Sequence, residues 1–119
     1  MTDPSVLEQS ALDALSETTG DDPAFLADLI DVFLADAVEL FATMDGATAG
    51  GDAEELRRAA HSLKSNSATF GATALNGLSR SIEELGKAAD LESAPPLIAE
   101  ARTEFARVEQ RLTEIRISL

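Results

Sequence analysis

The segment that decides the fold is residues 52–71, which read DAEELRRAAHSLKSNSATFG. A helix advances about 100° per residue, so positions three and four apart fall on one side of it. Five mostly apolar residues lie within roughly 40° of a common direction: Leu56, Ala60, Leu63, Ser67 and Phe70. The segment therefore predicts a helix with one buried face.

The only histidine of the chain, His61, lies on the other side of this helix. Its position is about 140° from the centre of the buried stripe. Its neighbours at helical spacings of three, four and seven residues are Arg57, Arg58, Lys64, Ser65 and Ala68. We therefore expect an exposed imidazole flanked by cations.

The ends of this helix carry their own signals. Asp52, followed by Glu55 three residues later, resembles a capping box. The glycine-containing segment 46–51 before it predicts a break in the chain. Gly71 is expected to interrupt or end the helix.

Upstream, two Asp-Pro pairs predict helix starts. Asp3-Pro4 should open a short helix, and Asp22-Pro23 a long one with an apolar stripe from Phe25 to Met44. The long helix has a second apolar flank, including Val32, which could receive the short opening helix.

Downstream, the apolar spacing predicts two further helices. One runs from Leu75 to Ala89, weakened near its end by Gly86. The other follows a connection at residues 90–96, with the two prolines at 95 and 96 in its first turn, where backbone N–H groups lack intrahelical partners. Its stripe from Ile98 to Leu119 suits packing in a bundle and would also suit oligomerisation.

The predicted fold class is all-α, an antiparallel up-and-down four-helix bundle with a short additional N-terminal helix. The chain has 119 residues, no Trp and no Tyr, and its apolar residues are skewed to Ala and Leu, as helices favour. This length suits one domain, so residues 1–119 are expected to form a single unit.

The net charge of −13 opposes binding to nucleic acid and to an anionic membrane surface. The absence of cysteine and the single histidine exclude a disulfide framework, a thiolate metal site and a multi-histidine site. We expect no metal or cofactor of its own and no direct use of ATP, because no nucleotide-binding element is recognisable.

The segment Met1-Thr2-Asp3-Pro4 lacks signal-peptide features, and no apolar run is long enough to span a membrane, so the expected location is the cytoplasm. A chain that starts at Met1 and ends with its last helix pattern is compatible with a free-standing protein.

Transient phosphorylation is the chemistry that suits an exposed imidazole among cations. Imidazole is a competent nucleophile near neutral pH. Lys64, one turn away, would offset the charge of a phosphoryl group. Arg57 and Arg58 would serve the phosphoryl group or an acidic partner surface, or else form a solvated face with acidic pairs such as Glu54 and Arg58. No Ser-His-carboxylate set, calcium loop or helical Glu-x-x-His motif is visible.

The segment His61-Ser62-Leu63-Lys64, a small residue at 65 and then Phe70-Gly71 resembles the signature of histidine phosphotransfer (HPt) domains. The order of turns and helices along the whole chain is similar too. The resemblance implies a four-helix bundle with His61 as phosphoacceptor and Lys64 as charge stabiliser. It also implies that the catalytic apparatus, including Mg²⁺, belongs to the partner receiver domain rather than to this chain.

Two positions depart from the family pattern or vary within it. Ser65 stands where a glycine usually follows the motif lysine, and its hydroxyl is placed to hydrogen-bond the imidazole or a phosphoryl group. Glu83 stands where some members carry a glutamine facing the histidine. A carboxylate there would orient a neutral ring but repel phosphate.

The leading hypothesis is a carrier, not an enzyme, that passes a phosphoryl group between His61 and receiver-domain aspartates. The expected partners are response-regulator receivers and/or a hybrid histidine kinase, and the expected state is a monomer. Arg57, Arg58, Ser65 and Ala68 are the candidate partner-binding residues. Two alternatives stay open: a helical adaptor that never carries phosphate, and a bundle-type phosphatase acting on receivers.

Overall fold

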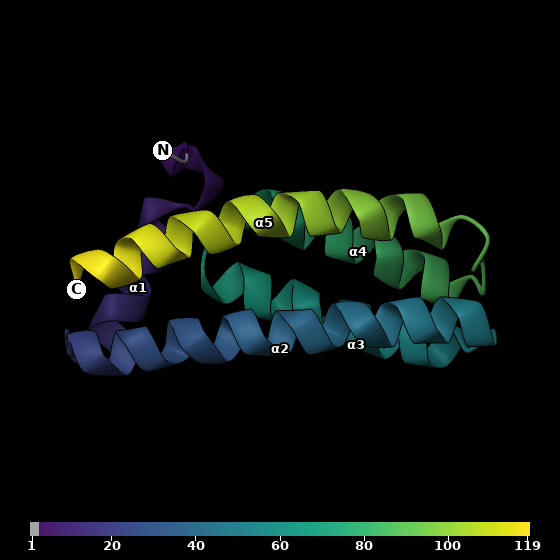
Figure 1. The fold of residues 1–119 in the computed structure, drawn as a ribbon, viewed down its shortest axis with the longest axis horizontal. Helices are drawn as coiled ribbons and strands as arrows, with labels where there is room; N and C mark the ends of the chain where they lie inside the picture. Colours follow the sequence, from purple (N-terminus) through teal and green to yellow (C-terminus); the bar gives the residue numbers. More distant parts are fainter. Residues whose placement is uncertain (1–2) are drawn as a thin grey trace.

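The structure, a computed structural model, describes residues 3–119. Over this range every regular element is helical, which confirms the predicted all-α class (Figure 1). The elements in chain order are the 3₁₀ turn η1 (Pro4–Val6) and the helices α1 (Gln9–Thr18), α2 (Pro23–Gly50), α3 (Ala53–Thr69), α4 (Thr73–Lys87) and α5 (Ala94–Ser118). Met1 and Thr2, half of the N-terminal segment tested above for signal-peptide features, lie outside the described residues.

The four longest helices pack around one core. Helix α3 contacts α2 and α4, and α5 contacts the same two helices, so the contacts run from α2 through α3, α4 and α5 back to α2. The molecule measures 43 × 25 × 20 Å, and the two longest helices, α2 and α5, follow its long axis (Figure 1). All five residues of the predicted α3 stripe are buried: Leu56, Ala60, Leu63, Ser67 and Phe70.

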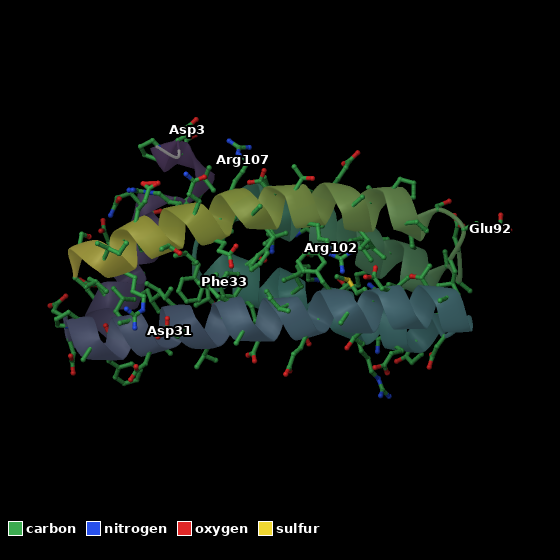
Figure 2. The ribbon with its side chains drawn as sticks, in the orientation of Figure 1. Asp3, Asp31, Phe33, Glu92, Arg102 and Arg107 are labelled. Carbon is green, nitrogen blue, oxygen red and sulfur yellow. The ribbon has the colours of Figure 1, made fainter. Side chains whose placement is uncertain are left out.

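Aromatic rings join three of these helices at one end of the core. The ring of Phe33 on α2 stacks on that of Phe70, with 4.8 Å between the ring centroids. The ring of Phe105 on α5 contacts the Phe33 ring edge-on, with 6.2 Å between centroids. Figure 2 shows Phe33 in the space between α2 and α5. Because Phe70 directly follows α3, this cluster fixes the C-terminal end of the histidine helix against its neighbours.

The predicted break at residues 46–51 is wrong in its extent. Helix α2 continues through Gly46 to Gly50, and only Gly51 leaves it, with a left-handed φ of +74°. A glycine inside a helix costs only about 1 kcal/mol relative to alanine. Burial of Met44 and Ala47 on either side of Gly46 is sufficient to carry the helix through. The predicted starts fared better, since Asp22 caps α2 and Asp52 caps α3 through their side chains.

Asp3-Pro4 was expected to open one short helix, but the N-terminal segment contains two separate elements. Asp3 caps only η1, the chain is extended at Leu7, and α1 begins at Gln9. The backbone N–H of Glu8 donates a hydrogen bond to the Gly71 carbonyl at 2.9 Å, which ties this segment to the end of α3. Val32 stays 56% exposed, so the opening helix does not cover this residue, as the sequence allowed it to.

Helices α2 and α5 are linked by two bidentate ion pairs. Arg102 binds Asp45, and Arg116 binds Asp31. Arg116 holds the pKa of Asp31 below its usual range, because its guanidinium donates hydrogen bonds to that carboxylate. Asp31 and Asp45 of α2 are thereby paired with cations of α5.

Candidate functional site

The site is built where α3 and α4 approach most closely. At one end, a Cβ added to Gly86 of α4 would lie 2.8 Å from the backbone nitrogen of Arg57, so only glycine fits there. At the other end, the Asn76 side-chain amide donates to the Lys64 carbonyl at 2.8 Å. Ser67 of α3 and Ser79 of α4 have small side chains and are fully buried. Close packing along this seam brings side chains of α4 within reach of His61.

His61 lies on the outer side of α3 with its side chain 55% exposed, as the helical wheel predicts. Its Nδ1 lies 2.7 Å from Oε2 of Glu83, a residue of α4 whose side chain is only 3% exposed. One edge of the ring is therefore held by a buried group while the opposite edge faces solvent.

Lys64 binds the same carboxylate. Its Nζ donates to Glu83 Oε1 at 2.6 Å, so each oxygen of Glu83 has one partner on α3. The hydrogen bond from Lys64, followed by the one from His61, outweighs burial and holds the pKa of Glu83 below its ordinary value. Glu83 is therefore a carboxylate at neutral pH, and a carboxylate only accepts hydrogen bonds. We accordingly assign the ring proton to Nδ1, which leaves the lone pair of Nε2 free and exposed.

The two arginines beside His61 are engaged elsewhere. Arg57 Nε donates to Glu54 at 2.9 Å, and Arg58 Nε lies 3.4 Å from the same carboxylate. Arg57 is the main reason that the pKa of Glu54 falls to about 2. The structure therefore shows the acidic pairing that the sequence left open for these residues, with both arginines sharing the one carboxylate of Glu54. Arg58 remains the more accessible of the two arginines, with 70% of its side chain exposed.

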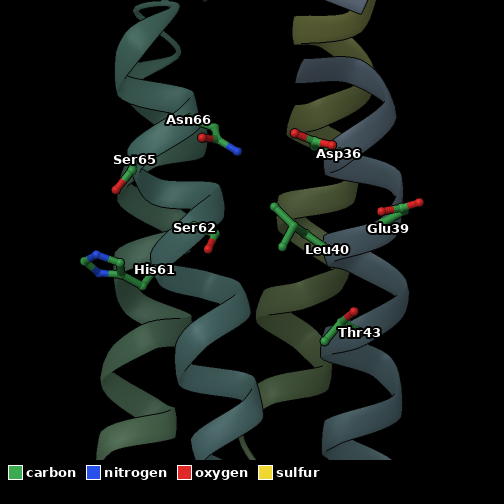
Figure 3. A pocket seen from close by; sticks show the side chains of 8 residues that line it. All are labelled: Asp36, Glu39, Leu40, Thr43, His61, Ser62, Ser65 and Asn66. Carbon is green, nitrogen blue, oxygen red and sulfur yellow. The ribbon is translucent and has the colours of Figure 1, made fainter. Parts of the chain in front are cut away.

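A groove of about 440 Å³ runs beside His61 between α2 and α3 (Figure 3). Its α3 wall consists of His61, Ser62, Ser65 and Asn66. Its α2 wall consists of Asp36, Glu39, Leu40 and Thr43, with Leu40 reaching toward α3. Figure 3 shows the ring of His61 and the hydroxyl of Ser65 on the side of α3 away from α2, at the rim of this groove.

Two of the candidate partner-binding residues line different depressions. Ser65 shares the groove with His61, whereas Ala68 lines a separate depression with Glu8, Gly71 and Asn76. The α2 wall was not among the predicted site residues, because the register of two helices distant in sequence cannot be derived from their separate periodicities. The hydrogen bond of Asn76 to the Lys64 backbone was missed for the same reason. Glu83 was found only through the family resemblance, and the structure adds its contacts with both His61 and Lys64.

Residues 3–119 contain neither a metal-binding cluster nor a membrane-spanning helix. No three acidic, histidine or cysteine side chains there are grouped as a metal site requires. No helix in that range has the length and apolar character needed to cross a membrane.

Comparisons with known proteins agree with this geometry. The family model described as "Hpt domain" matches residues 28–116. The crystal structure of histidine-containing phosphotransfer protein B (HptB) from Pseudomonas aeruginosa PAO1 superposes with a TM-score of 0.88 at 32% sequence identity. That match covers 98% of this chain and 99% of the other. No curated protein sequence matches significantly. The match of the family model to most of the chain identifies it as a member of the Hpt domain family.

Proposed function

We propose that this protein is a phosphorelay carrier that accepts a phosphoryl group on Nε2 of His61 and exchanges it with receiver-domain aspartates. One observation carries the proposal: an exposed imidazole whose Nδ1 is bound to a buried carboxylate at 2.7 Å. This contact fixes the ring's orientation and leaves Nε2 as its only free nucleophilic atom.

The transfer step follows from this arrangement. The Nε2 lone pair attacks the phosphorus of a receiver aspartyl phosphate, a P–N bond forms, and the P–O bond to the aspartate breaks to release a carboxylate. Positive charge develops on the ring because its Nδ1 keeps its proton. The Glu83 carboxylate stabilises that charge, and the reverse transfer returns the electron pair to Nε2.

Lys64 makes this carboxylate compatible with a phosphoryl group. An unneutralised glutamate beside the ring would repel the phosphoryl dianion. Lys64 offsets that charge through its contact with Glu83, and its side chain keeps 24% exposure toward solvent. Its role in the proposal is therefore double: partner of Glu83 in the resting protein and charge stabiliser of the phosphorylated one.

The remaining parts of the proposal concern the whole molecule. We propose that residues 1–119 form one domain, an antiparallel up-and-down four-helix bundle of α2 to α5 with α1 added at the N-terminus. The protein acts as a cytoplasmic monomer and not as an enzyme, since partner receivers with their Mg²⁺, or a hybrid histidine kinase, supply the catalysis. Arg58 and Ser65 are the candidate partner-binding residues with the most accessible positions near His61. Arg57 and Ala68 take supporting places at the edge of the contact.

The test is phosphotransfer profiling against purified, phosphorylated receiver domains. We expect rapid appearance of an acid-labile, alkali-stable label on the wild-type protein and none on the His61→Gln variant. Binding of receivers without any label on the wild-type protein would instead support the adaptor. Catalytic loss of receiver phosphate at substoichiometric protein, unaffected by His61→Gln, would support the phosphatase.

A further inference from the structure

Four of the five acidic residues of α2 fall into two groups. Asp31 and Asp45, on the side facing α5, are each bound by an arginine. Asp36 and Glu39, on the side facing the His61 groove, are exposed, and within residues 3–119 they form no ion pair or side-chain hydrogen bond. We name these two residues the acidic wall.

The groove supplies no charge to balance the acidic wall. Its other lining residues are His61 and five uncharged side chains, and no described lysine or arginine lines it. The nearby Lys64 is bound to Glu83, and Arg57 and Arg58 share Glu54, so these three cations are engaged outside the groove. Asp36 and Glu39 are two unpaired carboxylates near His61. Their negative charge raises the free energy of the phosphorylated histidine unless a cation binds close to them.

The surface next to the acidic wall is apolar. A second groove of about 160 Å³ shares Asp36 and Asn66 with the first and is lined further by Leu29, Val32 and Phe33. Val32 is 56% exposed, although it lies beside the core residue Phe33. A partner that covers both grooves would meet an apolar strip bordered by negative charge.

We propose that the acidic wall selects the partner receiver. The occupant of the groove is a receiver domain whose docking element has an apolar face bordered by lysine or arginine residues. These basic residues pair with Asp36 and Glu39. This inference rests on the proposed function and specifies the partner chemistry of the same site. Charge complementarity supports it, because a cation placed there would neutralise the only unpaired charges of the groove. Rim charges of this kind act mainly on the rate of association and on the choice of partner.

The test uses the double variant Asp36→Lys/Glu39→Lys in the full chain. The matched control is Glu92→Lys/Glu100→Lys, which makes the same change in net charge at exposed positions before and on α5, a helix that packs on α2 and α4. Phosphoramidate, which releases ammonia on transferring its phosphoryl group, provides a receiver-independent measure of His61 reactivity. Circular dichroism checks that each variant is folded.

We expect the wall variant to lose about tenfold or more in kcat/KM for transfer from its fastest receiver at low salt, and the loss to shrink at high salt as screening increases. The control should lose less than about twofold. Changing the receiver's lysines and arginines to glutamate one at a time should reveal at least one change that slows transfer to the wild type and speeds transfer to the wall variant.

Two failures are distinguishable. If the wild type exchanges phosphoryl groups normally and the wall variant keeps pace with the control, the acidic wall has no selective role and the inference is overturned alone. If neither phosphoramidate nor any receiver labels His61 of the wild type, the proposed function falls, and the inference falls with it.

Discussion

At the scale of single residues, the account depends on Glu83, which connects the histidine and the lysine of the family motif. We predict that Glu83→Gln slows phosphorylation of His61 by phosphoramidate about tenfold. The amide still accepts from Nδ1–H but cannot stabilise the charge that develops on the ring, and hydrogen bonds to charged groups contribute about 1.5–3 kcal/mol. Glu84→Gln, at the exposed neighbouring position on α4, is the control and should leave the rate unchanged. Equal rates for Glu83→Gln and wild type would contradict the role given to Glu83.

Glu83 should also make stability depend on pH. Its pKa in the folded protein lies below the ordinary value of 4.5, chiefly because Lys64 donates to it. The stability that the carboxylate contributes is therefore fully present above the unfolded-state pKa and is lost as the pH falls through the lower, folded-state pKa. We predict that the wild type is more stable than Glu83→Gln by about 1 kcal/mol or more at about pH 7, and that this difference shrinks below about pH 4.5. Urea unfolding of both proteins over this range measures it, and a difference that grows toward acid pH would refute the argument.

At the scale of elements, the seam between α3 and α4 decides whether Glu83 reaches His61. Gly86→Ala forces a Cβ against the Arg57 backbone, so we predict a loss of about 1–3 kcal/mol in the free energy of unfolding. Gly77→Ala on the same helix is the matched control, since a Cβ there meets nothing within 4 Å. The control should be stabilised by about 0.5–1 kcal/mol, because alanine loses less backbone entropy than glycine in a helix. Similar effects of the two substitutions would show that the seam is looser than described.

The same seam marks the limit of what the sequence could predict. The buried stripe of α3 and the exposure of His61 follow from one helix alone, and the structure confirms both. The position of Glu83 opposite His61 depends on the register between two helices, and that register is set by the tight contact at Gly86. Ala68 is exposed, and it lines a depression with Glu8 and Asn76, a contact between elements that one helical wheel cannot give.

Helix ends show a similar division. Asp22 and Asp52 were readable as caps because a cap acts within three residues of itself. Gly46 misled the prediction because burial of its neighbours, a property of the tertiary fold, outweighs the local cost of glycine. Val32 shows a similar limit, because an apolar flank on a helix shows that something can pack there without showing what does.

At the scale of the whole molecule, a net charge of −13 on 119 residues dominates the electrostatics. Mutual repulsion among the carboxylates opposes the compact state, and salt screens it. We predict that raising NaCl from about 0.02 M to about 0.5 M increases Tm by roughly 3 °C, which corresponds to under about 1 kcal/mol for a domain of this size. A fall in Tm would mean that screening of the exposed α2–α5 pairs, such as Arg102 with Asp45, outweighs the relief of repulsion.

The central claim is that Glu83 holds Nδ1 of His61 and so directs the phosphoryl group to Nε2. The most direct test is NMR of the uniformly ¹⁵N-labelled protein after treatment with phosphoramidate, in which the coupling of phosphorus to the ring nitrogens identifies the bonded atom. We predict a single phosphohistidine with phosphorus on Nε2 and the proton retained on Nδ1. Phosphorus on Nδ1, or a His61 ring that stays unmodified while the protein remains folded, would contradict the account.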